Sequence, residues 1–288
     1  MNNQTKGLLI TTLGVLFVVP DALFVRLIDA DALTISFWRN FLTGAVTLIG
    51  LFAIYGAKTV SKIKSTGKSG LIYAVFTGLS SILFVTAISN TSVANVVFIL
   101  ASMPIFAALF SWLWLKERIS KRMVWTIFLV ALGLSVIAFG PSTNATAHWT
   151  GDLMALGAAA SFAVGLTAAR RAKAISMVPA IPVAYIGAAL AVLPFTAPLE
   201  IITSQWVLVA MHGGLFILIS TTFLALGPRY IPSAEVALLI LLESVLSPLL
   251  VWYFIGEEPG KWAMIGGAIV ISVLFASNMI ALLRKRPS

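Results

Sequence analysis

The sequence predicts an all-α integral membrane protein in which ten transmembrane helices form two inverted five-helix repeats around a central cavity. Three observations support this prediction: an apolar composition, ten apolar runs of membrane-spanning length, and a duplication of the chain. Hydrophobic residues make up 60% of the 288 residues, and charged residues only 10%. Soluble globular domains contain roughly 45–50% apolar and about 25% charged residues, so the expected solvent of this surface is lipid.

Ten apolar runs are separated by short polar or charged breaks. A helix needs about 20 apolar residues to cross the hydrocarbon core. Because lipid offers the backbone no hydrogen-bond partners, runs this long indicate helices rather than the short alternating strands of a membrane barrel. The runs lie at residues 7–28, 32–55, 70–89, 91–115, 122–140, 151–170, 178–199, 206–226, 231–255 and 262–283. The first is long, carries Asp21 and Arg26, and lacks a small-residue cleavage site, so we expect a helix rather than a secretory signal.

The distribution of basic residues predicts that both termini are cytoplasmic. Of the 19 Lys and Arg residues, only Lys261 falls in a predicted outer loop, while Arg26 and Arg39 lie within or at the ends of helices. Cytoplasmic loops hold the excess of Lys and Arg. The net charge of +9 is spread over separate loops and tails, which suits an anionic inner leaflet and argues against nucleic acid as a partner. We expect a bacterial-type inner membrane.

The second half of the chain repeats the first. A shift of 140 positions aligns residues 94–121 with residues 234–261 without a gap, and it pairs Trp112 with Trp252, Glu117 with Glu257 and Lys121 with Lys261. A shift of 144 places Arg26 on Arg170. The predicted repeats are residues 1–143 and 144–288. Because five is odd, the second repeat enters the membrane from the opposite side, as in many secondary transporters with two gates around one site.

These repeated helices resemble a known family. Each begins Ala-x-Val, at Ala94 and Ala234, contains Pro104 or the triplet Leu242-Glu243-Ser244, and carries a tryptophan followed five residues later by glutamate. In this it resembles the drug/metabolite transporter superfamily and, within it, the EamA-type ten-helix exporters, including bacterial YddG-like proteins. The resemblance covers nearly the whole chain and is strongest at residues 91–140 and 231–280.

The resemblance implies two inverted EamA repeats around a central cavity and export of small organic solutes such as amino acids or other metabolites. The sequence departs from the family at one position. Many members have a proline after the glutamate of the ninth helix, whereas Ser244 stands here and Pro248 follows four residues later.

Glu243 is the main candidate for substrate binding. It is the thirteenth residue of the run 231–255, and a charge at the bilayer centre costs at least about 2.5 kcal/mol on insertion scales. We therefore expect it to face the cavity, where it binds a substrate amine or carries a proton. The alternative is a structural carboxyl that links two helices. Because Glu243 also lies where the two inverted repeats are expected to meet, a role in substrate or proton binding is favoured over a structural role.

Other polar and aromatic residues are predicted to line the cavity. His212 has two open interpretations, helix packing with an internal hydrogen bond or a proton relay, and Gly213 and Gly214 beside it let another helix come close. For each aromatic, lipid contact or core packing is the simpler interpretation. The predicted lining comprises Glu243, Ser244, Trp38, Ser81, Phe84, Asn95, Phe98, Ser102, Met103, Phe162 and His212.

The candidates for opening and closing the cavity are prolines, which bend helices, and charged residues that can form ion pairs. Asp21 is expected to pair with Arg26 and Arg39 near the outer end, where such pairs either gate the mouth or only neutralise one another. Proline frees a backbone carbonyl and bends a helix. The gating and hinge candidates are Pro20, Asp21, Arg39, Pro104 and Pro248. Glu117 and Glu257 are expected to fix loop geometry.

The alternatives to a transporter are a membrane enzyme and a channel. The chain has no cysteine, HExxH, G-x-S-x-G, DxxD-type pair or phosphate loop, so we expect no enzyme, no metal and no cofactor. A channel usually builds its pore through oligomeric symmetry, whereas this chain contains its own two-fold relation. The expected partners are a small-molecule substrate and the lipid bilayer, and a monomer is sufficient.

Overall fold

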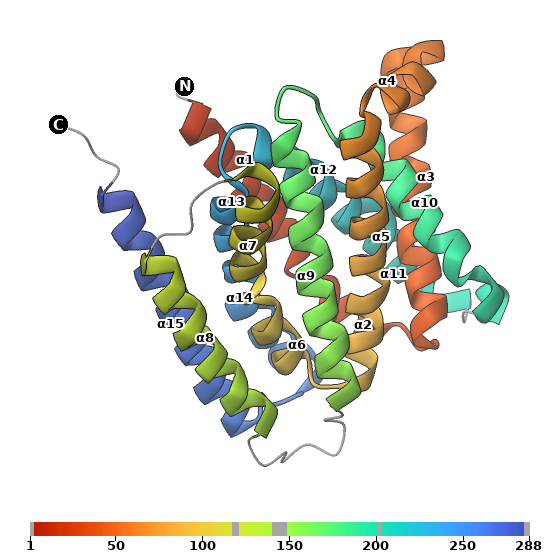
Figure 1. Cartoon of the computed structure of the whole chain (residues 1–288). Coiled ribbons are helices and arrows are strands. Elements are labelled where there is room, and N and C mark those ends of the chain that lie inside the picture. The colour runs from red at the N-terminus through yellow and green to blue at the C-terminus, as the bar shows by residue number, and fades with distance from the viewer. Residues whose placement is uncertain (1–2, 117–120, 140–148, 201–202, 285–288) are drawn as a thin grey trace.

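The computed structural model describes residues 3–116, 121–139, 149–200 and 203–284, and these residues form helices without a strand among them (Figure 1). The longer helices are α1 (Asn3–Val18), α3 (Ala32–Tyr55), α5 (Gly67–Asn90), α7 (Met103–Leu115), α8 (Lys121–Phe139), α9 (Trp149–Arg171), α10 (Ile181–Val192), α14 (Leu241–Ile255) and α15 (Lys261–Arg284). The shorter ones are α2 (Asp21–Leu27), α4 (Thr59–Ser65), α6 (Val93–Leu100), α11 (Trp206–Met211), α12 (Leu218–Leu226) and α13 (Ser233–Leu239).

Short 3₁₀ and π segments complete the chain. The 3₁₀ turns are η1 (Gly56–Lys58), η2 (Val178–Ala180), η3 (Leu193–Phe195), η4 (Pro198–Glu200), η5 (Thr203–Gln205) and η7 (Gly227–Arg229). The segment η6 (His212–Ile217) is a π-helix between α11 and α12. π-Helical segments are rare and occur frequently at functional sites.

Eight stretches of the described residues are long and apolar enough to cross a membrane. They coincide with eight of the ten runs, namely Thr5–Leu27, Ala32–Ser65, Gly67–Asn90, Val93–Leu115, Trp149–Arg171, Val178–Phe195, Trp206–Arg229 and Glu235–Ile255. The other two runs contain shorter apolar stretches, Val124–Gly133 in α8 and Met264–Ser277 in α15. The count of ten therefore remains a prediction.

The helices stand side by side, and α1 begins at the same end of the bundle at which α15 ends (Figure 1). We call this the terminal end, and the end at which α6, α9 and α15 begin the opposite end. α8 and α15 pack together at one edge of the bundle, where Thr126 Oγ1 donates to Ser277 Oγ at 2.6 Å. Apolar side chains such as Ile54, Leu71 and Tyr253 are exposed, as expected of a surface that faces lipid.

Three of the candidate spans are interrupted near the middle of the bundle. Pro20 separates α1 from α2, and the α6–α7 junction at Ala101 and Ser102 precedes Pro104. At this junction the Ser102 N–H donates to the Ile99 carbonyl and the Ile105 N–H donates to the Ser102 carbonyl, both at 2.9 Å, which are 3₁₀-type bonds. Pro104 lies in the first turn of α7, where its missing N–H costs no helical bond, so proline suits the start of a new helix at this point.

The third interruption lies at Ile240, between α13 and α14. Under the 140-residue shift it falls within two residues of the α6–α7 junction. Pro248, a predicted hinge, lies inside α14, which continues through it. The chain therefore breaks before Glu243 rather than at Pro248, and it does so without a proline.

Candidate functional site

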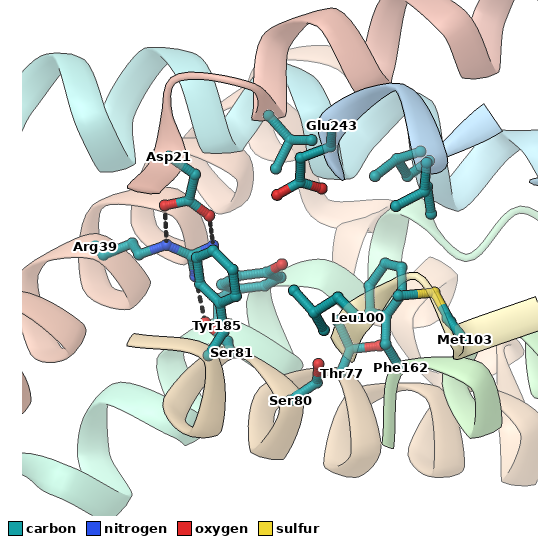
Figure 2. Close-up of a pocket in the computed structure, with 14 residues that line it drawn as sticks. Asp21, Arg39, Thr77, Ser80, Ser81, Leu100, Met103, Phe162, Tyr185 and Glu243 are labelled. Atoms are coloured by element: carbon teal, nitrogen blue, oxygen red, sulfur yellow. Dashed lines mark hydrogen bonds and ion pairs between the residues drawn. The ribbon is translucent and has the colours of Figure 1, made fainter. Parts of the chain in front are cut away.

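A cavity of about 70 Å³ lies where these interruptions meet. Its walls come from nine helices between α2 and α14, together with Val18 at the end of α1 and Ile240 at the α13–α14 interruption. Figure 2 shows the lining side chains. The apolar lining is Val18, Phe84, Leu100, Met103, Phe162, Leu224 and Ile240, and the polar lining is Asp21, Arg39, Thr77, Ser80, Ser81, Tyr185 and Glu243. A cavity of this size holds a few water molecules. It is far below the roughly 300 Å³ at which ligand pockets begin.

One wall carries a fully buried ion pair. Arg39 Nε donates to Asp21 Oδ1 at 2.9 Å, and Arg39 Nη2 donates to Asp21 Oδ2, so the pair is bidentate. The third guanidinium nitrogen, Nη1, donates to Ser81 Oγ, which in turn donates to Asn40 Oδ1 at 2.6 Å. Asp21 is 1% exposed and Arg39 6%. Two charges so deeply buried are tolerated because each is paired and hydrogen-bonded.

His212 supports this pair from outside the cavity lining. Its Nε2 lies 2.6 Å from Asp21 Oδ1, and its ring stacks on Phe24 with the centroids 5.3 Å apart. Together Asp21, Arg39, Asn40, Ser81 and His212 form what we call the central cluster.

A glycine brings His212 into position. A Cβ on Gly213 would lie 2.7 Å from the Arg39 carbonyl oxygen, so only glycine lets η6 approach α3 this closely. Thr43 Oγ1 donates to the Gly213 carbonyl at 2.8 Å and fastens the two elements. Gly214 has open space around it and plays no such part. Of the two glycines predicted to allow a close approach, the structure assigns that role to Gly213.

Glu243 enters the cavity from the first turn of α14 (Figure 2). Its side chain is 6% exposed, and no hydrogen bond or ion pair joins it to another side chain in the part of the chain that the structure describes. Met103 occupies the equivalent position under the 140-residue shift and lines the same cavity. The two repeat-related helices thus present one apolar and one acidic side chain to the same space.

The structure brings together about half of the predicted lining. Glu243, Ser81, Phe84, Met103 and Phe162 line the cavity, and the gating candidates Asp21 and Arg39 lie in its wall. Arg39 also lies over the Phe84 ring, 5.7 Å from its centroid. Asp21 and Arg39 therefore sit beside the cavity at the middle of the bundle, whereas the sequence placed their pair near the outer end.

The other predicted lining residues lie elsewhere. Trp38 packs on Trp206 and donates from Nε1 to the Pro198 carbonyl at 2.9 Å. Phe98 packs toward α15, against Ala94 and Ile271. Their large aromatic rings pack between helices, which agrees with core packing as the simpler interpretation of an aromatic residue.

The hydroxyls of Ser102 and Ser244 are taken up by backbone carbonyls. Ser102 Oγ donates to Ile99 at 2.7 Å within its own helix interruption, and Ser244 Oγ donates to Val97 at 2.8 Å across the α6–α14 contact. Conversely, sequence reasoning missed Thr77, Ser80 and Tyr185. Thr77 lies four residues before Ser81, and Ser80 lies four residues before Phe84. This helical spacing places all four on one face of α5, so it could have predicted the two missed residues.

A second polar network, which we call the end cluster, lies at the opposite end of the bundle. Arg26 Nε is 2.9 Å from Glu257 Oε2, and Glu257 Oε1 accepts from the backbone N–H of Val93 at 2.8 Å, at the start of α6. Asp152 in α9 accepts from Thr91 Oγ1 at 3.0 Å and from Asn95 Nδ2 at 3.4 Å. Arg26 thus pairs with Glu257 rather than Asp21, and Asn95 serves this network rather than the cavity. Glu257 fixes local geometry as expected, whereas Glu117 lies outside the described residues.

No group of three His, Asp or Glu side chains close enough to hold a metal ion occurs in the part of the chain that the structure covers. The arrangement instead offers a buried, mixed polar and apolar space with one unpaired carboxylate. A lining of this kind, apolar with a few polar groups, is typical of sites that bind small organic molecules, whereas the volume in this conformation is too small for one.

Comparison with known proteins gives consistent matches. The profile of the EamA-like transporter family matches residues 5–139 and again residues 149–279. A Bacillus subtilis (strain 168) protein named "Uncharacterized transporter YwfM" is 32% identical over 206 residues, which are 66% of this chain and 68% of that protein. An Archaeoglobus fulgidus protein named "Uncharacterized transporter" is 40% identical over 70 residues, 24% of this chain and 25% of that protein. This chain also superposes on a protein whose crystal structure has been solved. The alignment covers 98% of this chain and 100% of the other, with a TM-score of 0.69 and 18% sequence identity, so the two share the fold.

Proposed function

Because the chain is a member of the EamA-like transporter family and an integral membrane protein, we propose that it is a secondary transporter that exports small organic solutes, amino acids and related metabolites. The observation that carries this proposal is the buried cavity with charged groups from both family segments. Asp21 and Arg39 come from the first segment, and Glu243 comes from the second. Ionisable groups are expensive inside a membrane and mark substrate or ion pathways when they face an interior space.

Transport requires this cavity to change shape. An amino acid does not fit in about 70 Å³, so the solute must enter and leave through conformations more open than this one. Met103 and Ile240 line the cavity at the two repeat-related interruptions. We propose that the helices bend there, and at Pro20, to open one end at a time. Two inverted repeats supply two such gates around one site, which is alternating access.

The orientation and assembly follow from the same proposal. The excess of Lys and Arg in the predicted inner loops supports the proposal that both termini lie in the cytoplasm and that the protein lies in a bacterial-type inner membrane. We also propose that a monomer is a sufficient transport unit, because two inverted repeats within one chain supply both gates.

Uptake by purified protein in liposomes tests the proposal. The assay uses a panel of amino acids and related metabolites, with and without a pH gradient, for the wild type and Glu243→Gln. We expect the wild type to move at least one solute and Glu243→Gln to lose the transport or its response to the gradient. Equal transport by both proteins would make Glu243 structural. A folded wild-type protein that moves no solute would contradict the transporter proposal itself.

A further inference from the structure

The charges around the cavity are not equally available to a ligand. All three nitrogens of the Arg39 guanidinium already donate to Asp21 or Ser81. Both oxygens of Asp21 are taken by Arg39, and one of them also contacts His212. Glu243 faces the same space with no partner among the described residues, although it is more than nine-tenths buried. The one acidic group of the described lining that is left for a ligand is therefore the Glu243 carboxyl.

We propose that the cavity selects organic cations, with a protonated amine on the Glu243 carboxylate and an apolar body against Phe84, Phe162 and Met103. This inference rests on the proposed transport function and, among the small organic solutes proposed there, favours amines without a carboxylate over the amino acids themselves. A buried, unpaired carboxylate is costly and gains most from a cationic partner, because a charge-assisted hydrogen bond is strong in a site that excludes water. The apolar lining buries the rest of the solute.

A zwitterionic amino acid fits this site poorly. Its carboxylate would lie beside Asp21 and Glu243, and the one cation of the described lining, Arg39, is already paired with Asp21. The hydroxyls of Ser80 and Ser81 donate to the Ala158 carbonyl and to Asn40 Oδ1. Among the lining hydroxyls of the described residues, this leaves those of Thr77 and Tyr185 to donate to a ligand. Hydroxyl donors alone do not offset the repulsion between like charges and the lost hydration.

The test compares two ligands that differ by one group. Equilibrium binding to the purified, detergent-solubilised protein is measured for phenethylamine and for L-phenylalanine, which differ by the carboxylate. We expect phenethylamine to bind about tenfold more tightly or better, and Glu243→Gln to weaken its binding by about tenfold or more, the loss typical of one hydrogen bond to a charged group. 3-Phenylpropionate, which lacks the amine, should not compete.

Matched variants separate recognition from folding. Glu257→Gln makes the same chemical change outside the cavity and should leave the affinity for phenethylamine unchanged. Glu243→Gln loses no internal partner, so its melting temperature should equal or exceed that of the wild type. If it does not fold, Glu243→Met is used instead, because it copies the residue at the equivalent position of the first repeat.

The outcomes distinguish this inference from the function on which it rests. Equal affinity for the amine and the amino acid, or unchanged amine affinity in Glu243→Gln, would overturn the cation site and leave transport standing. Amine binding that depends on Glu243, in a protein that moves no solute in liposomes, would support the cation site and sink the transporter proposal.

Discussion

The central cluster and the end cluster each pair an arginine with a carboxylate, but their surroundings differ. Asp21 and Arg39 are at most 6% exposed, and every charged atom of the pair has a hydrogen-bond partner. Arg26 and Glu257 are 21% and 22% exposed and lie at the opposite end of the bundle. Similar residue types thus stand in two dielectric environments within one chain.

The two ion pairs differ in the free energy needed to separate arginine from carboxylate. Desolvating two charges can cost more than their attraction returns, so a buried pair is weak evidence for added stability, yet removal of one partner leaves a charge without compensation. Water solvates a partly exposed pair when it opens. The central pair is therefore expected to stay closed through the transport cycle, while the end pair is free to break and form again.

Arg39→Met should show the largest effect. The substitution leaves Asp21 buried with only His212 beside it, and breaking a buried pair in this way costs roughly 3–5 kcal/mol. Equilibrium unfolding in mixed micelles measures the loss, and Arg26→Met is the matched control from the end cluster. Equal destabilisation by the two variants would contradict the distinction between the clusters.

Removal of both central partners should cost less than removal of Arg39 alone. Asp21→Leu combined with Arg39→Met leaves no unpaired charge, and buried ion pairs replaced by apolar residues are often near neutral in stability. The four proteins of the double-mutant cycle give the coupling energy directly. A double variant as unstable as the sum of the single variants would show that the two side chains do not act as a pair.

Gly213→Ala should have an intermediate effect on the free energy of unfolding. The new Cβ would lie 2.7 Å from the Arg39 carbonyl oxygen, in a rigid backbone contact, and overpacking of this kind typically costs about 1–3 kcal/mol. Gly214→Ala is the control, because it has open space around it and should change stability little or raise it slightly. If Gly214→Ala lowered the free energy of unfolding more than Gly213→Ala, then the contact of η6 with α3 would not support the central cluster.

The apolar runs and the duplication were readable from the sequence because both are periodic or repeated signals. Eight of the runs coincide with stretches able to span a membrane, and the family profile matches twice. Glu243 lines the cavity, and the sequence pointed there because a lone charge in an apolar run has few other destinations. The 140-residue shift even relates the two interruptions beside the cavity.

The partners of the remaining charges could not be read in this way. From the sequence alone, either Arg26 or Arg39 could pair with Asp21. Which arginine does so depends on which helices approach each other in three dimensions. The contact of His212 with Asp21 spans 191 positions and depends on a π-helical segment that has no counterpart in the periodicity. Asn95 and Phe98 lie in the same apolar run as Met103, but the interruption at Ala101 and Ser102 puts them on α6 and Met103 on α7, and they contact other neighbours.

The smallest effect is expected for the end cluster. Arg26→Gln and Glu257→Gln should each lower the free energy of unfolding by about 1 kcal/mol or less, because water replaces the lost partner of a partly exposed pair. Raising the salt concentration should shrink the Arg26–Glu257 coupling energy and leave the Asp21–Arg39 coupling nearly unchanged, since ions screen exposed charges far more than buried ones. Two double-mutant cycles, each at low and high salt, measure both couplings. If both decrease in parallel with salt, then water reaches Asp21 and Arg39 as freely as it reaches the end of the bundle, and the central pair is no more enclosed than the end pair.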